Sequence, residues 1–323
     1  MKRLYKNLFL MSLALLVVVL SSCSGSDYLN AIPKKSTALI SVDLQQMASD
    51  KNAEDKAGML KSLLHVDDVD KCGIDISEKL YLFESADGNL GLCAKVSDEG
   101  DVEDWLASLA KKRIASEVKE RKGFHFSVLK DSWLVGFSGQ ALLVMGPVVA
   151  DAQAQLQQQM VKYLKAEEED GITVSPMYER LQTLSSPMAM VAQAQVLPEK
   201  FVAPFTLGAP KDTNPSQVVI AADMEVKDGI LQIQGETFSF NETIDKALQK
   251  AVQNYRPIKG SYVKSMPDDA LAGIFMNVNG EQFLPMMQSN RSLQTLLMGI
   301  NQAVDMDNIM RSVDGDMALF FAL

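Results

Sequence analysis

Residues 217–237 constrain the fold strongly because they specify a β-hairpin with one apolar side and one polar side. The dipeptide Asp228-Gly229 favours the positive φ angles of a two-residue hairpin turn. With that turn, apolar residues face each other in two cross-strand pairs: Val226 with Leu231, and Met224 with Ile233. One buried and one solvated side are typical of an antiparallel sheet that carries helices on a single face. The sequence therefore predicts an α+β fold.

Other stretches of the chain predict further elements of such a fold. Periodicity and turn residues indicate a strand over 38–44, helices over 45–64, a hairpin of 80–85 and 90–96 around Asp87-Gly88, a helix over 102–114, antiparallel strands over 124–145 and a helix over 150–164. The acidic run at residues 167–170 is typical of a solvated helix end or loop.

An internal repeat is indicated by two matches between distant segments. Residues 29–40 can be laid over residues 263–274, and residues 79–83 over residues 316–320. The repeat predicts a first α+β module over 29–258 and a second, incomplete module over 259–323. The second copy would stop in the strand that opens a hairpin in the first. Either the chain is then a fragment of a longer protein, or its last strand completes a sheet built by the first copy.

The amino terminus has the pattern of an export signal. Three basic residues, Lys2, Arg3 and Lys6, precede an uncharged run of residues 8–20 and then Ser21-Ser22-Cys23. That run is shorter than the roughly 20 residues that a bilayer-spanning helix needs. A signal peptide is predicted over residues 1–22. A conventional secretory signal that happens to contain a cysteine is the alternative.

Leu20-Ser21-Ser22-Cys23 resembles the lipobox of bacterial lipoproteins. The resemblance implies that the sulfur of Cys23 carries a lipid, and that two or three acyl chains hold the protein durably at a membrane. Residues 23–28 are small and polar at their start, which predicts a short flexible tether. We expect an outer-membrane anchor, with the periplasmic side favoured over the cell surface.

The charge of the mature chain bears on its partners. Removal of residues 1–22 takes away three basic residues and no acidic one, which leaves 28 basic and 41 acidic side chains and a net charge of −13. A balance of that sign repels phosphate backbones, and no basic stripe offsets it. Nucleic-acid binding is therefore excluded. The expected partners are the membrane, through the lipid on Cys23, and an unidentified envelope protein or ligand.

Two cysteines remain in the chain after Cys23. Cys72 and Cys93 can form a disulfide, which an exported protein permits, or remain two separate buried thiols. The sequence leaves both alternatives open. Two cysteines without neighbouring histidines are not a zinc-binding set.

Signatures of known chemistry are missing from the sequence. The chain has two histidines and lacks the metalloprotease, serine hydrolase, phosphate-loop and dinucleotide motifs. His125 alternates with phenylalanines, which predicts a place on the solvent face. Two acidic clusters lack the spacing of a calcium loop and are expected to be solvated loops or helix starts; they are Asp67, Asp68 and Asp70 after His65, and Asp305, Asp307, Asp314 and Asp316. No catalytic residue, metal site or cofactor is predicted.

Three features of the sequence carry a resemblance to a known family: the lipobox, the segment Tyr28–Pro33 before a strand ending in Val42-Asp43-Leu44, and the later return of the proline-strand pattern. Together they resemble a domain-of-unknown-function family of Bacteroidetes lipoproteins, number 4836. The resemblance implies an origin and an address, but no activity. We expect a non-enzymatic binding or structural role in the cell envelope. The alternatives are a hydrolase of envelope glycans or peptides that uses Asp/Glu pairs, and a solute-binding lipoprotein.

Overall fold

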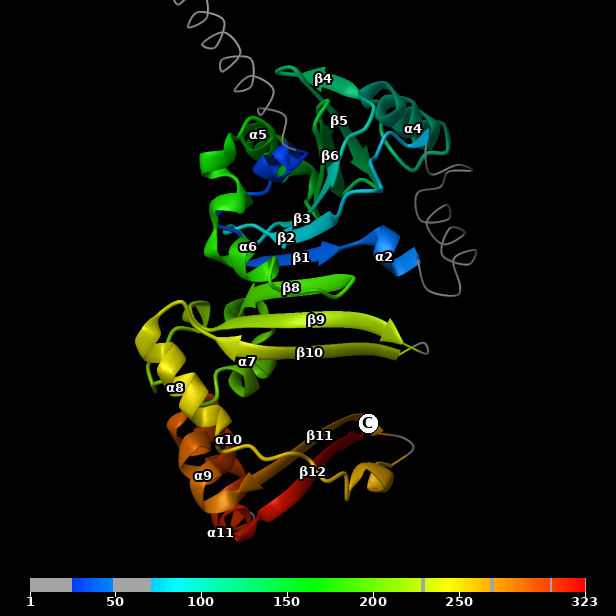
Figure 1. The fold of residues 1–323 in the computed structure, drawn as a ribbon. Helices are drawn as coiled ribbons and strands as arrows, with labels where there is room; N and C mark the ends of the chain where they lie inside the picture. Colours follow the sequence, from blue (N-terminus) through cyan, green and yellow to red (C-terminus); the bar gives the residue numbers. More distant parts are fainter. Residues whose placement is uncertain (1–24, 49–70, 228–229, 268–269, 303, 323) are drawn as a thin grey trace, which may run out of the picture. The chain divides into compact units, whose positions relative to one another are not determined.

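The computed structural model describes residues 25–48, 71–227, 230–267, 270–302 and 304–322 (Figure 1). The chain divides into two compact units, residues 1–189 and residues 190–323. Both units combine antiparallel strands with helices, so the predicted α+β class is confirmed. The module boundary predicted from the repeat, at residue 258, lies inside the second unit.

An antiparallel sheet forms the centre of the first unit. Across the sheet its strands are β1 (Ala38–Val42), β2 (Leu80–Glu84), β3 (Leu90–Lys95), β7 (Ala141–Gly146), β6 (Trp133–Phe137), β5 (Phe124–Leu129) and β4 (Lys119–Arg121). The hairpin predicted around Asp87-Gly88 is confirmed, because Phe83 pairs with Gly91 and Gly88 has a φ of +77°. The strands predicted over 124–145 are also present. The three-residue strand β4 was not predicted.

Helices lie against both faces of this sheet, whereas the hairpin pattern predicted helices on one face (Figure 1). Helix α4 (Glu99–Lys111) begins after Asp98, whose side chain accepts a hydrogen bond from the backbone N–H of Asp101. As its spacing predicted, α4 buries a stripe made of Val102, Trp105, Leu106 and Leu109. Helix α5 (Gln153–Leu164) packs on β6 and β7 from the other side. Strands β6 and β7 are apolar on both faces, so both faces need cover.

Several shorter helices complete the first unit. They are η1 (Asp27–Ala31), α2 (Leu44–Ala48), η3 (Ala150–Ala152), η4 (Glu168–Asp170), η5 (Ile172–Val174) and α6 (Pro176–Leu181). The acidic run forms η4 and is exposed, as predicted. The helices predicted over 45–64 are described only as far as α2, since residues 49–70 lie outside the described residues.

The second unit begins within β8 (Met188–Gln193). It continues through η6 (Ala194–Val196), α7 (Glu199–Phe205), η7 (Pro215–Gln217), β9 (Val219–Lys227), β10 (Ile230–Phe238) and α8 (Glu242–Val252). The predicted hairpin register is confirmed, because Val226 pairs with Leu231 and Met224 with Ile233. The expectation that this side is buried holds only at the base of the hairpin. Val226 and Ile233, nearer the turn, are 53% and 59% exposed.

The last part of the second unit is a strand pair joined by helices. Its elements are η8 (Val263–Ser265), β11 (Ala270–Asn279), α9 (Gly280–Ser289), α10 (Arg291–Asn301), α11 (Met306–Ser312) and β12 (Asp314–Ala322). Strand β12 pairs antiparallel with β11, a pairing that the sequence did not predict. Phe283, Leu284, Leu297 and Met310 of the connecting helices form a core with Val278 of β11.

Candidate functional site

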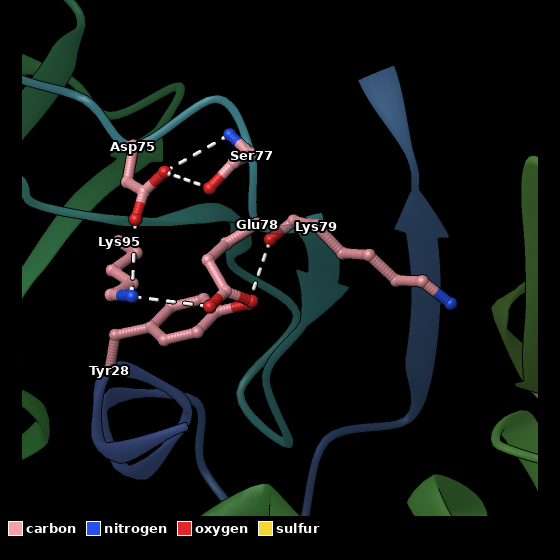
Figure 2. A network of polar contacts seen from close by, with 6 residues as sticks. All are labelled: Tyr28, Asp75, Ser77, Glu78, Lys79 and Lys95. Carbon is pink, nitrogen blue, oxygen red and sulfur yellow. Dashed lines mark hydrogen bonds and ion pairs between the residues drawn. The ribbon is translucent and has the colours of Figure 1, made fainter. Parts of the chain in front are cut away.

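The residues that follow the predicted tether are fixed in the first unit. Tyr28 and Ile32 are buried, and the Tyr28 hydroxyl donates a hydrogen bond to the backbone oxygen of Lys79 over 2.9 Å (Figure 2). The Tyr28 ring lies 6.3 Å from the ring of Tyr81, centroid to centroid. Burial raises the pKa of both tyrosine hydroxyls, so both stay protonated. Tyr28, predicted to be the last tether residue, is therefore part of the folded core.

A network of charged side chains lies beside Tyr28 (Figure 2). The ammonium group of Lys95 is 3.1 Å from a carboxylate oxygen of Asp75 and 3.1 Å from one of Glu78. Asp75 also accepts hydrogen bonds from the hydroxyl and the backbone N–H of Ser77. A Cβ added at Gly25 would lie 3.4 Å from the Glu78 carboxylate. The predicted tether therefore enters the fold beside this ion pair, which gives the site a structural role in holding the junction.

The hydrogen bonds from Ser77, together with Lys95, hold the pKa of the Asp75 carboxyl below its ordinary value of 3.8. We expect Asp75→Asn to lower the free energy of unfolding at neutral pH by up to about 1 kcal/mol, because the network is partly solvated. The ionised carboxylate stabilises the fold above its unfolded pKa, and this contribution is lost as the pH falls through the lower folded pKa.

The difference between wild type and Asp75→Asn in urea unfolding should therefore shrink as the pH falls below about 3.8. Asp104→Asn, on the exposed side of α4, is the matched control and should change little at any pH. A difference for Asp75→Asn that stays constant down to pH 2 would exclude an electrostatic role for Asp75.

Several residues singled out by the sequence lie outside the described residues. They are Cys23 with the whole signal peptide, and the first acidic cluster with its histidine: His65, Asp67, Asp68 and Asp70. The lipidation of Cys23 therefore stays a prediction. Among the described residues, no helix is long and apolar enough to cross a bilayer.

Cys72 and Cys93 are two buried thiols in the structure. Cys72 packs with Ala94 and the α4 residues on one face of the sheet. Cys93 follows the alternation of β3 to the opposite face, where its thiol donates to the backbone oxygen of Tyr28 over 3.4 Å. Burial raises the pKa of the Cys93 thiol. The two sulfur atoms lie on opposite faces of the sheet, so they do not form a disulfide. Two separate buried thiols were one of the two alternatives that the sequence left open.

The alternation around His125 predicted that it lies on the solvent face, but in the structure it is only partly exposed. Its ring is partly buried and stacks on Phe137 with centroids 5.2 Å apart. Its Nδ1 lies 3.1 Å from a carboxylate oxygen of Glu99, at the start of α4. The pair links α4 to β5.

The second acidic cluster is spread over separate structural roles. Asp305 caps α11, accepting from the backbone N–H of Asn308, as a predicted helix start should. Asp314 forms an ion pair with Arg256 at 2.7 Å. Asp316 accepts hydrogen bonds from the backbone N–H groups of Lys259 and Ser261, which hold its pKa below the ordinary value. Within the described part of the chain, no group of three or more acidic, histidine or cysteine side chains is arranged to hold a metal ion.

An exposed surface in the second unit was missed by the sequence analysis. Residues 252–266, here called the apolar segment, expose five large apolar side chains: Val252, Tyr255, Ile258, Tyr262 and Met266. Their spacing is close to helical, but beyond α8 the segment is irregular, with only the single turn of η8. A run of helically spaced apolar residues interrupted by Pro257 and Gly260 was the signal that could have identified it. Large exposed apolar side chains concentrated in one short segment mark a candidate interaction site.

The apolar segment is held in place by hydrogen bonds to β11 and β12. The backbone N–H of Arg256 donates to the backbone oxygen of Asn277 over 2.8 Å. The side chain of Asn277 donates both to the backbone oxygen of Pro257 and to Asp316. Because its polar atoms are fixed on the strand pair, the segment presents its apolar side chains in a defined arrangement.

Comparisons with known proteins give little direct functional information. No curated protein matches the chain. The solved structure of TP0453 in crystal form III is similar to it over 69% of this chain and 96% of that chain, with a TM-score of 0.33 and 11% sequence identity. That similarity is too low to indicate a shared fold or function. The family model of a domain of unknown function, DUF4836, matches residues 44–322. The resemblance noted in the sequence is thus confirmed, and the chain belongs to the DUF4836 family.

Proposed function

We propose that this chain is a lipid-anchored protein of the cell envelope that binds a partner protein through the apolar segment of its second unit. The role is binding and is not enzymatic. The anchor rests on the lipobox at Cys23, and the outer membrane, on its periplasmic side, is the favoured address. Among the described residues, no observation favours the alternative hydrolase or the solute-binding lipoprotein.

The observation that carries the proposal is the exposure of large apolar side chains on a segment that is itself firmly held. Tyr255, Ile258 and Tyr262 are each about half exposed, and the hydrogen bonds to Asn277 and Asp316 fix the backbone between them. A preorganised apolar surface binds with less loss of conformational entropy than a flexible one. Tyrosine is also enriched at the energetic centres of protein interfaces.

The junction at Tyr28 supports the anchor. A lipid on Cys23 would be only five residues from a buried aromatic side chain, so the fold would stay close to the bilayer surface. Two acyl chains or more make such an attachment durable, because each buried methylene contributes about 0.8 kcal/mol.

Mass spectrometry of native protein tests the anchor. We expect a mature chain that begins at Cys23 and exceeds the polypeptide mass by a diacylglyceryl group, with or without a third acyl chain. A bare thiol at Cys23, or a precursor that keeps residues 1–22, would show that the anchor is wrong.

Photo-crosslinking in the native cells tests the binding surface. A photoreactive amino acid at Ile258 should give one discrete adduct of higher mass, since this side chain projects from the apolar segment. The same amino acid at Lys246, on the exposed side of α8, is the control and should give no adduct. If no adduct forms at Ile258, a protein partner at this surface is contradicted.

A further inference from the structure

The buried residues of η1 determine which surface of the first unit lies next to the predicted anchor. Tyr28 and Ile32 are 4% and 0% exposed, and η1, which contains Tyr28, contacts β3, β7 and α5. The hydroxyl of Tyr28 donates to the backbone oxygen of Lys79, and its own backbone oxygen accepts from the thiol of Cys93. The chain is therefore attached firmly to the sheet at Tyr28.

Only a short length of chain separates Cys23 from this attachment. A Cβ added at Gly25 would lie 3.4 Å from a carboxylate oxygen of Glu78 and 3.7 Å from the ammonium nitrogen of Lys95, so Gly25 lies against the charged network drawn in Figure 2. Two residue steps lead from Cys23 to Gly25, and fully extended they span about 7 Å. The predicted lipid is therefore attached within two residues of this network.

This length restricts how the first unit can lie on a bilayer. The polar headgroup layer on each side of the hydrocarbon core is about 5–7 Å thick. A chain of at most about 7 Å between Cys23 and Gly25 cannot carry the fold away from that layer. The unit can tilt about Cys23, but the side chains around Gly25 remain the part of it that lies nearest to the headgroups.

The side chains around Gly25 form a polar surface, here called the anchor face, made of Gly25, Ser77, Glu78 and Lys95. Gly25 and Ser77 are exposed, and the side chains of Glu78 and Lys95 are 38% and 28% exposed. Asp75 adds a second carboxylate beside Lys95. Charged groups are costly to bury in hydrocarbon, so the anchor face fits the headgroup layer and not the acyl chains.

The charge of the anchor face indicates which headgroups it fits. Two carboxylates, from Asp75 and Glu78, surround the single ammonium group of Lys95. Anionic lipid surfaces attract lysine and arginine and repel carboxylates, so this excess of negative charge disfavours them. A zwitterionic headgroup offers a cationic group to Glu78 and a phosphate to Lys95 without net repulsion.

We propose that the anchor face lies against the headgroups of zwitterionic phospholipids when Cys23 carries its lipid. The first unit is then held on the bilayer in a restricted set of orientations, with Gly25, Ser77 and Glu78 towards the membrane. This inference rests on the proposed function, because it requires the lipid on Cys23, and it names the surface that the membrane contacts.

Fluorescence quenching on vesicles tests this proposal. The lipidated protein carrying Ser77→Cys is purified from native membranes, labelled with a thiol-reactive fluorophore and reconstituted in phosphatidylcholine vesicles that contain a lipid with a spin-labelled headgroup. Cys72 and Cys93 are buried and the sulfur of Cys23 carries the lipid, so the label reacts with the introduced thiol. We expect strong quenching at this position.

Ala86→Cys, labelled in the same way, is the matched control. Ala86 is exposed beside the hairpin turn, and β2 carries the chain about 15 Å from the anchor face before that turn. Because of this separation, quenching at residue 77 should be at least about twice the quenching at residue 86. Both positions are exposed, so both variants should have the circular dichroism of the wild type. Quenching at residue 77 that is equal to or weaker than quenching at residue 86 would overturn the proposal.

Vesicles that also contain phosphatidylglycerol test the headgroup chemistry. Quenching at residue 77 should fall on these vesicles, and concentrated salt should restore it by screening the repulsion. Glu78→Lys reverses the charge at the anchor face, so its quenching should rise on the same vesicles. Glu103→Lys makes the same charge change on the exposed side of α4 and should behave like the protein with Glu103 intact. If phosphatidylglycerol increases quenching while Glu78 is intact, the anchor face prefers anionic headgroups and the proposal is wrong.

Mass spectrometry of the same preparation separates the two proposals. If Cys23 carries the diacylglyceryl group and quenching at residue 77 does not exceed quenching at residue 86, the anchor stands and the orientation fails. If the sulfur of Cys23 is bare, the anchor and the orientation fail together.

Discussion

Gly280→Ala is expected to destabilise the second unit by at least about 1–3 kcal/mol, the usual cost of inserting an atom into a packed site. Gly280 is the first residue of α9, and its N–H donates to the backbone oxygen of Val313 over 2.8 Å. A Cβ at this position would lie 1.7 Å from the backbone oxygen of Met310 in α11. Because a backbone atom cannot rotate away, α9 and α11 would have to separate, which disrupts the core that they share.

Urea unfolding followed by two probes measures this effect. Both tryptophans, Trp105 and Trp133, lie in the first unit, so their fluorescence reports on that unit, whereas far-ultraviolet circular dichroism reports on both. For Gly280→Ala we expect the urea midpoint from circular dichroism to fall further than the midpoint from fluorescence.

Gly299→Ala in α10 is the matched control. No atom lies within 4 Å of a Cβ at Gly299, so this variant should gain about 0.5–1 kcal/mol from helix propensity. An unchanged unfolding curve for Gly280→Ala would contradict the described packing of α9 on α11.

Tyr28→Ala is expected to lower the free energy of unfolding of the first unit by about 3–5 kcal/mol, as for other large aromatic truncations in a core. The variant leaves a cavity beside Tyr81 and removes the hydrogen bond to the backbone oxygen of Lys79. It also releases η1, so the residues beside the predicted tether should become sensitive to proteases.

Tyr28→Phe separates the two contributions. It keeps the ring against Tyr81 and removes only the hydroxyl, which should cost about 1 kcal/mol. Tryptophan fluorescence during urea unfolding and limited proteolysis near the amino terminus measure both variants. If Tyr28→Ala loses no more stability than Tyr28→Phe, the ring is not part of the core and the tether joins the fold elsewhere.

The sequence predicted those features that depend on neighbouring residues. Asp87-Gly88 and the alternation around it specify the β2–β3 hairpin, because turn and strands are adjacent in the chain. The same holds for the register of β9 and β10. Helix α4 was predictable because Val102, Trp105, Leu106 and Leu109 repeat with helical spacing.

Features that depend on distant parts of the chain were not predictable in the same way. Strands β11 and β12 are separated by three helices, and the pairing of Ile274 with Leu319 leaves no local signal. Exposure also depends on what covers a residue. Tyr28 and Tyr262 have similar neighbours in the sequence. Tyr28 lies in η1, which contacts β3, β7 and α5, and is 4% exposed, whereas Tyr262 is 46% exposed. The apolar residues of the segment and the breaks at Pro257 and Gly260 are visible in the sequence, but the exposure of these side chains was not predictable from it.

Photo-crosslinking at Ile258 in the native cells tests the apolar segment as a binding surface most directly. The account predicts one discrete adduct of higher mass at Ile258, which is 52% exposed, and none at Lys246 on the exposed side of α8. No adduct at Ile258, or the same adducts at both positions, would contradict the proposal that this segment binds a partner protein.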